Sequence, residues 1–242
     1  MKTCYSCGEK AIKDGIFKSN IEEFILQRLP KTNKLYHKKD VLPQHLIGLK
    51  PNTIVFYFGS KKRIITNKIQ KFEKAYGNLP NSGCTKTNSK GEANFYLDCP
   101  QVYKSLNGNV YGRHLHFVYW DDKKKMWKDN LFTHKIICHV DKKYVKMYGS
   151  KCLIIDALPE KMYEKEHIKK AINIPYTKRI QEKDVFEAMK ERGFRTKNKN
   201  VPIIVYCYNK ACNASVQLIK KLNKIGFHNV VDYEKGIQDW IH

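Results

Sequence analysis

The sequence predicts an α/β domain with a parallel sheet flanked by helices over residues 148–242, preceded by a β-rich (α+β) domain over residues 1–147. After residue 150, apolar strand-like runs alternate with helical patterns, which is typical of a parallel sheet. Before residue 150, aromatic alternating segments are separated by turn residues, and no helical pattern lies between the last three. That arrangement indicates a β-rich, sandwich-like module.

The first domain is predicted to begin with a helix and to continue mainly as strands. Residues 19–29 carry apolar side chains on one helical face, and Pro30 ends that helix. A short helix is expected over residues 67–76, and turns are expected over residues 77–91. The turn-then-strand run Thr87–Phe95 resembles an edge of prealbumin-like and Ig-like sandwiches. The predicted strands cover residues 52–58, 92–97, 113–120 and 131–140.

The second domain is predicted from apolar runs and helical patterns that follow one another in turn. Residues 201–206 are continuously apolar, as expected for a strand that is buried on both faces. The helix that follows has apolar residues at helical spacing and ends at Gly226. The predicted strands cover residues 152–156, 171–174, 201–206 and 229–232. The predicted helices cover residues 161–165, 181–192, 214–225 and 236–241.

The composition excludes several classes of protein. Hydrophobic residues make up 42% of the chain, which is enough for a core, so wholesale disorder is excluded. No apolar stretch reaches the roughly 18 residues that a membrane span needs, so no membrane segment is expected. The N-terminus has no apolar run, which argues against a secretory signal. Eight cysteines are too dilute for a disulfide scaffold, so we expect thiols in a reducing, intracellular compartment, the cytoplasm.

The chain is strongly basic, with 46 Lys and Arg against 23 Asp and Glu and a net charge of +23. Such an excess favours polyanion binding through counterion release, and nucleic acid is one such partner. Most of the bases are lysines spread along the chain, and lysine lacks the planar fork that reads phosphates and guanines. The sequence leaves two interpretations open: a solvated lysine-rich surface, or a basic module that binds nucleic acid or a protein.

Cys207 comes directly after the predicted strand 201–206 and shortly before the predicted helix 214–225. In α/β sheets, ligands bind beyond the carboxyl ends of strands, where loops run into helix N-termini. The first amides of a helix lack intrahelical partners, so we expect them, together with Lys210, to lower the pKa of this thiol. A thiolate here is a nucleophile that can hold a transferred group. The alternative is a small buried apolar side chain.

Residues 150–242 contain a series of short motifs in a fixed order. They are a strand ending in Asp, an aromatic residue, a His-Ile pair, an Ala-x-Asn-Ile-Pro run, a strand ending in Tyr-Cys, a Ser-initiated helix ending in Gly-Phe, and a Gly-Ile-x-x-Trp signature. In this sequence these are Leu153–Asp156, Tyr163, His167-Ile168, Ala171–Pro175, Val205–Cys207, Ser215–Phe227 and Gly236–Trp240. The series resembles the rhodanese domain, the sulfurtransferase family that carries sulfane sulfur as a cysteine persulfide.

The resemblance implies a sulfurtransferase that requires no cofactor. Cys207 would attack the outer sulfur of thiosulfate or another donor and hold it as a persulfide, which a thiol or cyanide acceptor then removes. Backbone N–H groups of residues 208–212 would surround the persulfide. Cys212 would resolve the persulfide as an internal disulfide, or simply pack at the helix start. The active-site loop consists of Tyr208, Asn209, Lys210, Ala211, Cys212 and Asn213.

The loop departs from the usual pattern of the family. Many members carry Arg five residues after the cysteine, where this chain has Cys212. The related cell-cycle phosphatases need the Arg of a Cys-x5-Arg loop to bind phosphate, and Asn213 stands at that position here, which disfavours a phosphatase. Asp156 and His167 are expected to cap and pin strands rather than to react. The alternative function is a non-catalytic rhodanese-like scaffold joined to a basic N-terminal binding module.

Two histidines in the first domain could be metal ligands. His114 and His116 are two residues apart on a predicted strand, so both rings point to one face and could share an ion. The run Arg113–Phe117 resembles the Arg-Pro-x-His-x-His-Phe strand of intradiol dioxygenases, in which two His and two Tyr bind ferric iron, although the Pro is absent. The alternative is a plain half-exposed strand. The candidate phenolates are Tyr76, Tyr103 and Tyr111.

Cys4 and Cys7 have the spacing that lets two thiolates bind one tetrahedral zinc ion. No second Cys-x-x-Cys is present, so a structural zinc requires further ligands that folding brings close. The candidates are Cys84, Cys99, Cys138, His114 and His116. A structural zinc and a frayed terminus both remain open.

Overall fold

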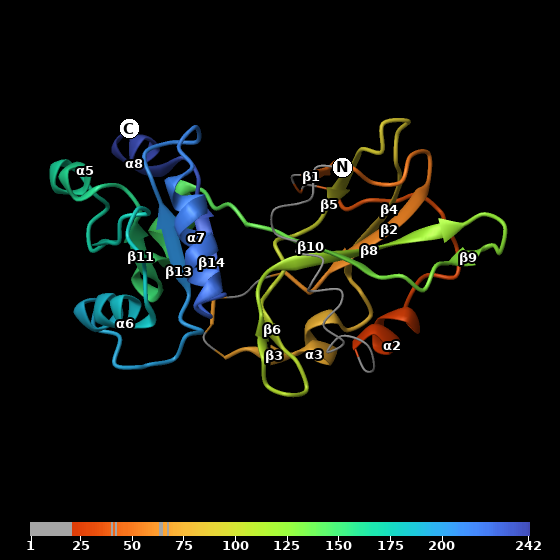
Figure 1. Ribbon diagram of the computed structural model, residues 1–242, viewed down its shortest axis with the longest axis horizontal. Coiled ribbons are helices and arrows are strands. Elements are labelled where there is room, and N and C mark those ends of the chain that lie inside the picture. The colour runs from red at the N-terminus through yellow and green to blue at the C-terminus, as the bar shows by residue number, and fades with distance from the viewer. Residues whose placement is uncertain (1–20, 40, 42, 63–64, 67) are drawn as a thin grey trace. The chain divides into compact units, whose positions relative to one another are not determined.

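The computed structural model describes residues 21–39, 41, 43–62, 65, 66 and 68–242. The chain divides into two compact units (Figure 1). The first consists of Met1–Ile64 and Gln70–Ile136, and the second of Ile65–Ile69 and Ile137–His242. Each unit has its own sheets, and the two are described separately.

The main sheet of the first unit is antiparallel, with the order β10-β8-β2-β4 and with β9 paired to β8. Alternate residues of β2 enter two separate buried clusters. Phe56 and Phe58 pack in one cluster, and Val55 and Tyr57 pack in the other, so this strand is covered on both faces. The strands are β2 (Ile54–Gly59), β4 (Asn81–Lys86), β8 (His114–Asp121), β9 (Met126–Trp127) and β10 (Phe132–Lys135).

Two smaller sheets and two helices complete the described part of the first unit. One sheet pairs β1 with β5, and the other has the order β3-β6-β7. Phe72 of α3 meets Phe24 of α2 edge to face, with ring centroids 5.3 Å apart, so the two helices close one side of the core. The elements are α2 (Ile21–Leu26), α3 (Phe72–Tyr76), β1 (Pro43–Leu46), β3 (Gln70–Lys71), β5 (Ala93–Tyr96), β6 (Tyr103–Lys104) and β7 (Val110–Tyr111).

Two expectations for this unit are wrong. The strand β8 is buried at every residue from His114 to Trp120, because side chains cover both of its faces, so it is not half-exposed. The stretch 77–91, which was expected to form turns, contains β4. Its small polar residues are typical of a turn but form a strand here, and Gly83 is needed there for packing rather than for a turn. A Cβ on Gly83 would lie 2.2 Å from the Tyr57 hydroxyl.

The second unit is built on the predicted parallel sheet, in the order β12-β11-β13-β14. The strands β11, β13 and β14 are buried at every residue, which agrees with their largely apolar sequences. The register pairs Asp156 with Tyr206, so β11 and β13 end at the same edge of the sheet. The strands are β11 (Leu153–Asp156), β12 (Ile172–Asn173), β13 (Ile203–Tyr206) and β14 (Val230–Tyr233).

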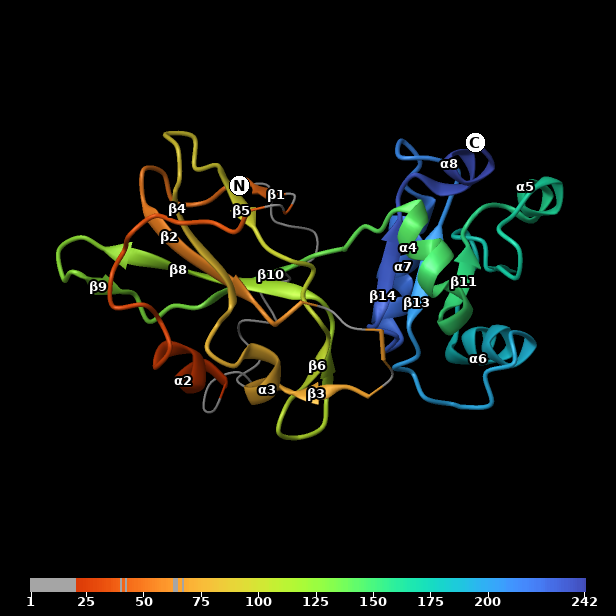
Figure 2. The same cartoon turned by 180° about the vertical axis from the view of Figure 1, so that it is seen from behind.

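Helices cover both faces of this sheet. In Figures 1 and 2, α7 lies on one face, against β13 and β14, and α4 lies on the other. Gly226 follows the end of α7 with a φ of +90°, as expected for a glycine at a helix C-terminus. The helices are α4 (Lys142–Tyr148), η2 (a 3-10 helix, Gly149–Lys151), α5 (Glu160–Lys165), α6 (Glu182–Glu191), α7 (Ala214–Lys224) and α8 (Gly236–Ile241).

The helix α4 was not expected from the sequence. It begins after Asp141, whose side chain accepts the Tyr144 N–H at 2.8 Å, and it buries Val145. With so small an apolar face, its periodicity is weak. Just before it, backbone hydrogen bonds join residues 138–140 to Asp232 of β14 and extend the sheet at that edge.

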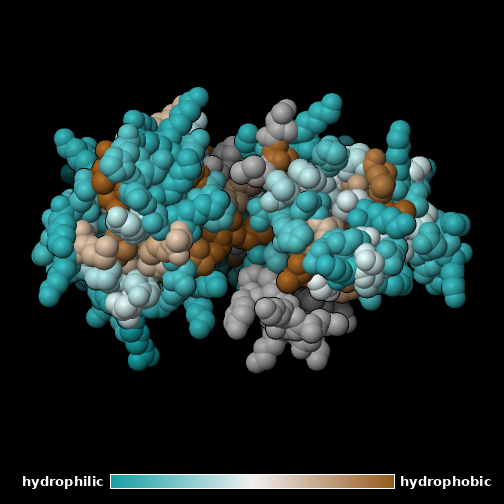
Figure 3. Space-filling view, turned by 90° about the horizontal axis from the view of Figure 1, so that it is seen from above, coloured by the Kyte–Doolittle hydropathy of each residue, from teal (hydrophilic) through white to brown (hydrophobic). Residues whose placement is uncertain are grey.

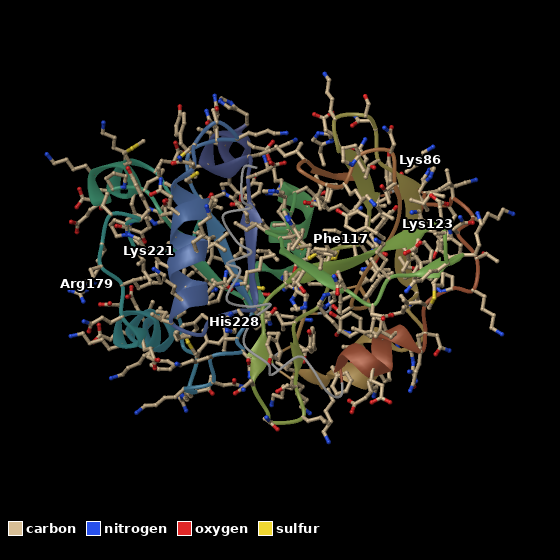
Figure 4. The ribbon with its side chains drawn as sticks, turned by 45° about the vertical axis from the view of Figure 1, so that its right-hand side comes forward. Lys86, Phe117, Lys123, Arg179, Lys221 and His228 are labelled. Carbon is tan, nitrogen blue, oxygen red and sulfur yellow. The ribbon has the colours of Figure 1, made fainter. Side chains whose placement is uncertain are left out.

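The surface is strongly charged. The face seen in Figure 3 is mainly hydrophilic, and Figure 4 labels basic side chains of both units, Lys86 and Lys123 in the first and Arg179 in the second. Because basic side chains are dispersed over both units, the arrangement does not support the expectation of nucleic-acid binding. In the part of the chain that the structure describes, no helix has the length and apolar character to cross a membrane.

The cysteines are not all thiols. Cys99 and Cys138 are each disulfide-bonded, so the expectation of eight free thiols is wrong. The inference of a reducing compartment loses its premise, and the cytoplasmic location stays a prediction. The free cysteines among the described residues are Cys84, Cys152, Cys207 and Cys212.

Candidate active site

Cys207 lies directly after the carboxyl end of β13, where the chain turns into α7. The strand β13 is central in its sheet, with β11 and β14 as parallel neighbours, so the loop 208–213 leaves from the middle of the sheet edge. Cys207 is 1% exposed, whereas Tyr208 of the same loop is 43% exposed. This is the position in the fold that the sequence predicts for Cys207.

The Cys207 sulfur has polar neighbours from the loop and from the start of α7. Its thiol donates to the Cys212 carbonyl at 3.3 Å, and the Asn209 carbonyl lies 3.9 Å away. The Ser215 hydroxyl is 3.4 Å from the sulfur, and the Ser215 backbone N–H also donates to it. The Cys212 thiol is a further hydrogen-bonding partner. Carbonyl acceptors favour a thiol, whereas the helix amide favours a thiolate.

These surroundings keep Cys207 protonated. Burial is the main cause that raises the pKa of Cys207 from 9.0 to about 11. The hydrogen bond with the Cys212 side chain acts in the same direction, and the hydrogen bonds from Ser215 act against it. The expectation of a lowered pKa is therefore wrong for this conformation, because desolvation outweighs the contribution of the helix start.

Asn209 binds two of the amides that were expected to surround the sulfur. The Ala211 N–H donates to the Asn209 side-chain oxygen at 3.1 Å, and the Cys212 N–H donates to the Asn209 carbonyl at 3.0 Å. The side-chain amide of Asn209 in turn donates to the Gln238 side chain at 2.9 Å. The expected ring of amides is therefore wrong for Ala211 and Cys212 in this conformation. Turning them toward the sulfur requires that both hydrogen bonds to Asn209 break.

The start of α8 holds the loop from the other side. The N–H groups of Ile237 and Gln238 donate to the carbonyls of Cys207 and Tyr208, at 2.9 and 3.0 Å. Gly236 makes this approach feasible, because it has a φ of +60° and no Cβ. A Cβ there would lie 2.1 Å from the Cys207 carbonyl oxygen.

Lys210 does not supply the positive charge expected beside the thiol. Its ammonium lies 3.9 Å from a Glu234 carboxylate oxygen, and its side chain is 77% exposed. Among the causes that shift the pKa of Cys207, none involves Lys210. The loop therefore relies on backbone and serine donors rather than on a lysine.

Asp156 and His167 make the contacts of structural residues. Asp156 accepts the Leu158 N–H at 2.8 Å just beyond the end of β11. The His167 ring stacks on Tyr163, with ring centroids 4.0 Å apart. Burial raises the pKa of Asp156, and hydrogen bonds from Leu158 and Tyr206 lower it. These contacts fix the turns around β11.

Three residues contribute to the site in ways that sequence analysis did not assign. The hydroxyl and the N–H of Ser215 contact the Cys207 sulfur, and Asn209 accepts hydrogen bonds from loop amides. Gly236, which has no Cβ, allows α8 to approach the loop closely. The signal for Ser215 was its place at the start of the helix after the cysteine. The signal for Asn209 was its position two residues before Ala211, because the side chain of Asn often accepts the backbone N–H two residues later in an Asx turn.

A family model decides the fold family of the second unit. The model of the rhodanese-like domain matches residues 141–242. Residues 141–242 are a rhodanese-like domain. The match does not extend into the first unit, whose resemblance to prealbumin-like and Ig-like sandwiches and to intradiol dioxygenases is not confirmed.

Several solved structures are similar to part of this chain. A single-domain sulfurtransferase from Saccharomyces cerevisiae is 20% identical with a TM-score of 0.36, and the match covers 46% of this chain and 93% of that protein. A human single-domain sulfurtransferase is 12% identical with a TM-score of 0.34, covering 43% and 94%. A Bacillus halodurans protein is 27% identical with a TM-score of 0.36, covering 43% and 71%. A search of curated proteins gave no match.

Outside the rhodanese-like domain, four side chains of the first unit converge on one point. The Nε2 atoms of His114 and His116, both on β8, are 3.2 Å apart. The hydroxyls of Tyr103 on β6 and Tyr76 on α3 lie 3.0 and 3.3 Å from His114 Nε2. All four residues are buried. Of the three candidate phenolates, the structure brings Tyr76 and Tyr103 to the histidines, while the Tyr111 ring packs on Tyr103 with centroids 5.5 Å apart.

The side chains of this His–Tyr cluster hydrogen-bond one another around His114 Nε2. His114 Nδ1 lies 2.7 Å from the Gly112 carbonyl, which only accepts, so Nδ1 carries the proton and Nε2 has one lone pair. The hydroxyls of Tyr76 and Tyr103 and the Nε2 atom of His116 surround this lone pair, and the two hydroxyls also hydrogen-bond each other. A metal ion among them would bind the imidazoles, with Gly112 and the Thr133 hydroxyl, 2.9 Å from His116 Nδ1, orienting the rings from behind.

The remaining metal predictions are not brought together. Cys4 and Cys7 lie outside the described residues. Cys99 and Cys138 are disulfide-bonded and offer no thiolate, and Cys84 is buried with its thiol directed to the Asn33 carbonyl at 3.7 Å. Within the described ranges, no group of three or more His, Cys, Asp or Glu side chains could hold an ion.

Proposed function

We propose that the rhodanese-like domain is a sulfurtransferase that carries sulfane sulfur on Cys207. The observation that carries this proposal is the position of Cys207 after β13, with the Ser215 N–H of α7 against its sulfur. In the first step, the Cys207 thiolate attacks the outer sulfur of thiosulfate or another donor. The donor's S–S bond breaks, and sulfite leaves with the electron pair. A thiol or cyanide acceptor then takes the outer sulfur and restores Cys207.

The resting loop must change before the first step. Cys207 is 1% exposed and donates its proton to a carbonyl, so a donor reaches the sulfur only when the loop opens. Opening that breaks the hydrogen bonds to Asn209 frees the N–H groups of Ala211 and Cys212. Amides directed to one point bind anions, so these two groups would then stabilise the persulfide.

The test is transfer of sulfur from thiosulfate to cyanide, measured as thiocyanate. The Cys207→Ser variant should lose the activity, because an alcohol does not form a persulfide. The matched control is Cys152→Ala. Cys152 is also a buried cysteine of this domain outside any disulfide, but it directly precedes the N-terminal end of β11, whereas Cys207 follows the carboxyl end of β13. This variant should keep the activity. Thiocyanate formation by Cys207→Ser at the unmodified protein's rate would overturn the proposal. A non-catalytic scaffold, the alternative, would give no turnover in any of the three proteins.

We also propose that the His–Tyr cluster of the first unit binds a metal ion, with ferric iron as the ion to test. The support is the convergence of two imidazole nitrogens and two phenol oxygens. His116 Nε2 and the hydroxyls of Tyr76 and Tyr103 each lie 3.0 to 3.3 Å from His114 Nε2. His114 and His116 would hold the ion through nitrogen, and Tyr76 and Tyr103 through oxygen. A bound ferric ion would supply a Lewis acid at that point.

The metal proposal is tested by adding ferric iron to the purified protein. Expected results are bound iron by elemental analysis and the visible tyrosinate-to-iron charge-transfer band. Tyr103→Phe should weaken both. The control is Tyr119→Phe, which removes a hydroxyl on β8 that accepts the Lys50 N–H instead. Absence of bound iron, or a band that Tyr103→Phe leaves unchanged, would contradict the site.

A further inference from the structure

Two cysteines lie together in the active-site loop, and they differ in exposure. Cys207 is 1% exposed, whereas Cys212 is partly exposed. The Cys207 thiol donates to the Cys212 carbonyl at 3.3 Å, and the Cys212 side chain is one of the groups that raise the pKa of Cys207. The two cysteines are therefore neighbours although four residues separate them in the sequence.

The loop itself fixes Cys212 over Cys207. The Cys212 N–H donates to the Asn209 carbonyl at 3.0 Å, which closes a turn between the two cysteines. The Asn209 side chain is bound to Gln238 of α8, and the Cys207 carbonyl accepts from Ile237 of the same helix. The Cys207 side of the turn is thus attached to α8, and the hydrogen bond from Cys212 to Asn209 places Cys212 beside Cys207 whenever the loop is closed.

We propose that Cys212 resolves the Cys207 persulfide and releases hydrosulfide, so that the domain is also a persulfide reductase. This inference rests on the proposed sulfurtransferase function. The Cys212 thiol loses its proton, and its sulfur attacks the inner sulfur, Sγ of Cys207. The S–S bond of the persulfide breaks, and the outer sulfur takes the electron pair and leaves as hydrosulfide. The two cysteine sulfurs are oxidised to a disulfide, and the sulfane sulfur is reduced.

The cycle closes with a dithiol reductant. Its first thiolate attacks Cys212, because that sulfur is the more exposed of the two, and forms a mixed disulfide. Its second thiol then breaks the mixed disulfide, which returns both cysteines to thiols and leaves the reductant oxidised. The expected partner is therefore a small molecule or a protein with two neighbouring thiols.

The experiment is a single turnover with thiosulfate under nitrogen, without added thiol, followed by measurement of hydrosulfide and by peptide mapping. Lys210 lies between the two cysteines, so tryptic cleavage separates residues 200–210 from 211–220. Only a disulfide between Cys207 and Cys212 keeps these two peptides together. The unmodified protein should release about one equivalent of hydrosulfide per chain and give the linked pair.

The variants distinguish failure of this inference from failure of the proposed function. Cys212→Ser should keep a stable persulfide on the peptide 200–210 and release no hydrosulfide, and Cys152→Ala should behave as the unmodified protein. If the unmodified protein keeps its persulfide just as Cys212→Ser does, the reductase inference is wrong and the sulfurtransferase stands. If neither protein gains sulfur on Cys207, the proposed function fails and the inference fails with it.

Discussion

The substitution Gly236→Ala perturbs the contact between α8 and the Cys207 loop. A Cβ at this position would lie 2.1 Å from the Cys207 carbonyl oxygen and 2.7 Å from that of Tyr208. Both are backbone atoms and cannot rotate away, so the helix or the loop must move. Gly236 also has a φ of +60°, which costs an L-residue about 1–2 kcal/mol. Overpacking adds about 1–3 kcal/mol, so we expect a total loss of about 2–5 kcal/mol in the free energy of unfolding.

The matched control is Gly193→Ala. Gly193 has a φ of +80° but no atom within 4 Å of its virtual Cβ, so the variant has the conformational cost alone, about 1–2 kcal/mol. The two variants are compared by urea denaturation, followed through Trp240 of α8. Gly236→Ala should lose more stability, and its Cys207 should react faster with iodoacetamide under native conditions. Equal stability losses in the two variants would refute the argument that close packing of α8 holds the loop.

Three further predictions concern titration and buried hydrogen bonds. Because the pKa of Cys207 is raised to about 11, its alkylation rate should rise about tenfold per pH unit from neutrality and show no plateau below about pH 9; a plateau near neutrality would contradict the burial argument. Tyr206→Phe removes the hydroxyl that accepts the Ile168 N–H at 3.0 Å, so the free energy of unfolding measured in urea should fall by about 1–3 kcal/mol. A loss well below about 1 kcal/mol would contradict this prediction. Asp184→Ala removes a helix cap and should cost about 1 kcal/mol. The hydrogen bond from Lys178 lowers the pKa of Asp184 in the folded protein. The stability that Asp184 contributes is therefore present above its unfolded-state pKa and lost as the pH falls through its folded-state pKa. A stability difference between the unmodified protein and Asp184→Ala that persists in acid would contradict this.

The sheet and the position of Cys207 could be predicted because their signals are local. The apolar run of β13 is long enough to mark a strand buried on both faces, and the amphipathic α7 marks the helix that follows. Together they place Cys207 at the carboxyl edge of the sheet. The ionisation state of its sulfur could not be predicted in this way, because it depends on which loop groups face the sulfur and on the burial of the side chain.

The loop conformation escaped prediction for a specific reason. A helix start near a cysteine indicates free amides, but Asn209 competes for two of them with its side chain and its carbonyl. The approach of α8 depends on the positive φ of Gly236, which the sequence permits without requiring it. Such contacts are set by the folded geometry.

In the first unit, the strand pattern of β8 was visible, but its burial was not. His114 and His116 suggest a polar face, and only the folded unit brings Tyr76 and Tyr103 to that face from other elements. The strand β4 was hidden for the opposite reason, because its small polar residues look like a turn although they lie in a buried sheet. Long-range contacts decided both cases.

The most direct test of the central claim is the location of the transferred sulfur. Cys212→Ser is treated with thiosulfate, and its peptides are analysed by mass spectrometry without reduction. The sulfurtransferase account predicts one added sulfur on the peptide 200–210, which carries Cys207, and none when Cys207 is also replaced by serine. A protein that gains no sulfur, or that gains it on a different cysteine, would contradict the account.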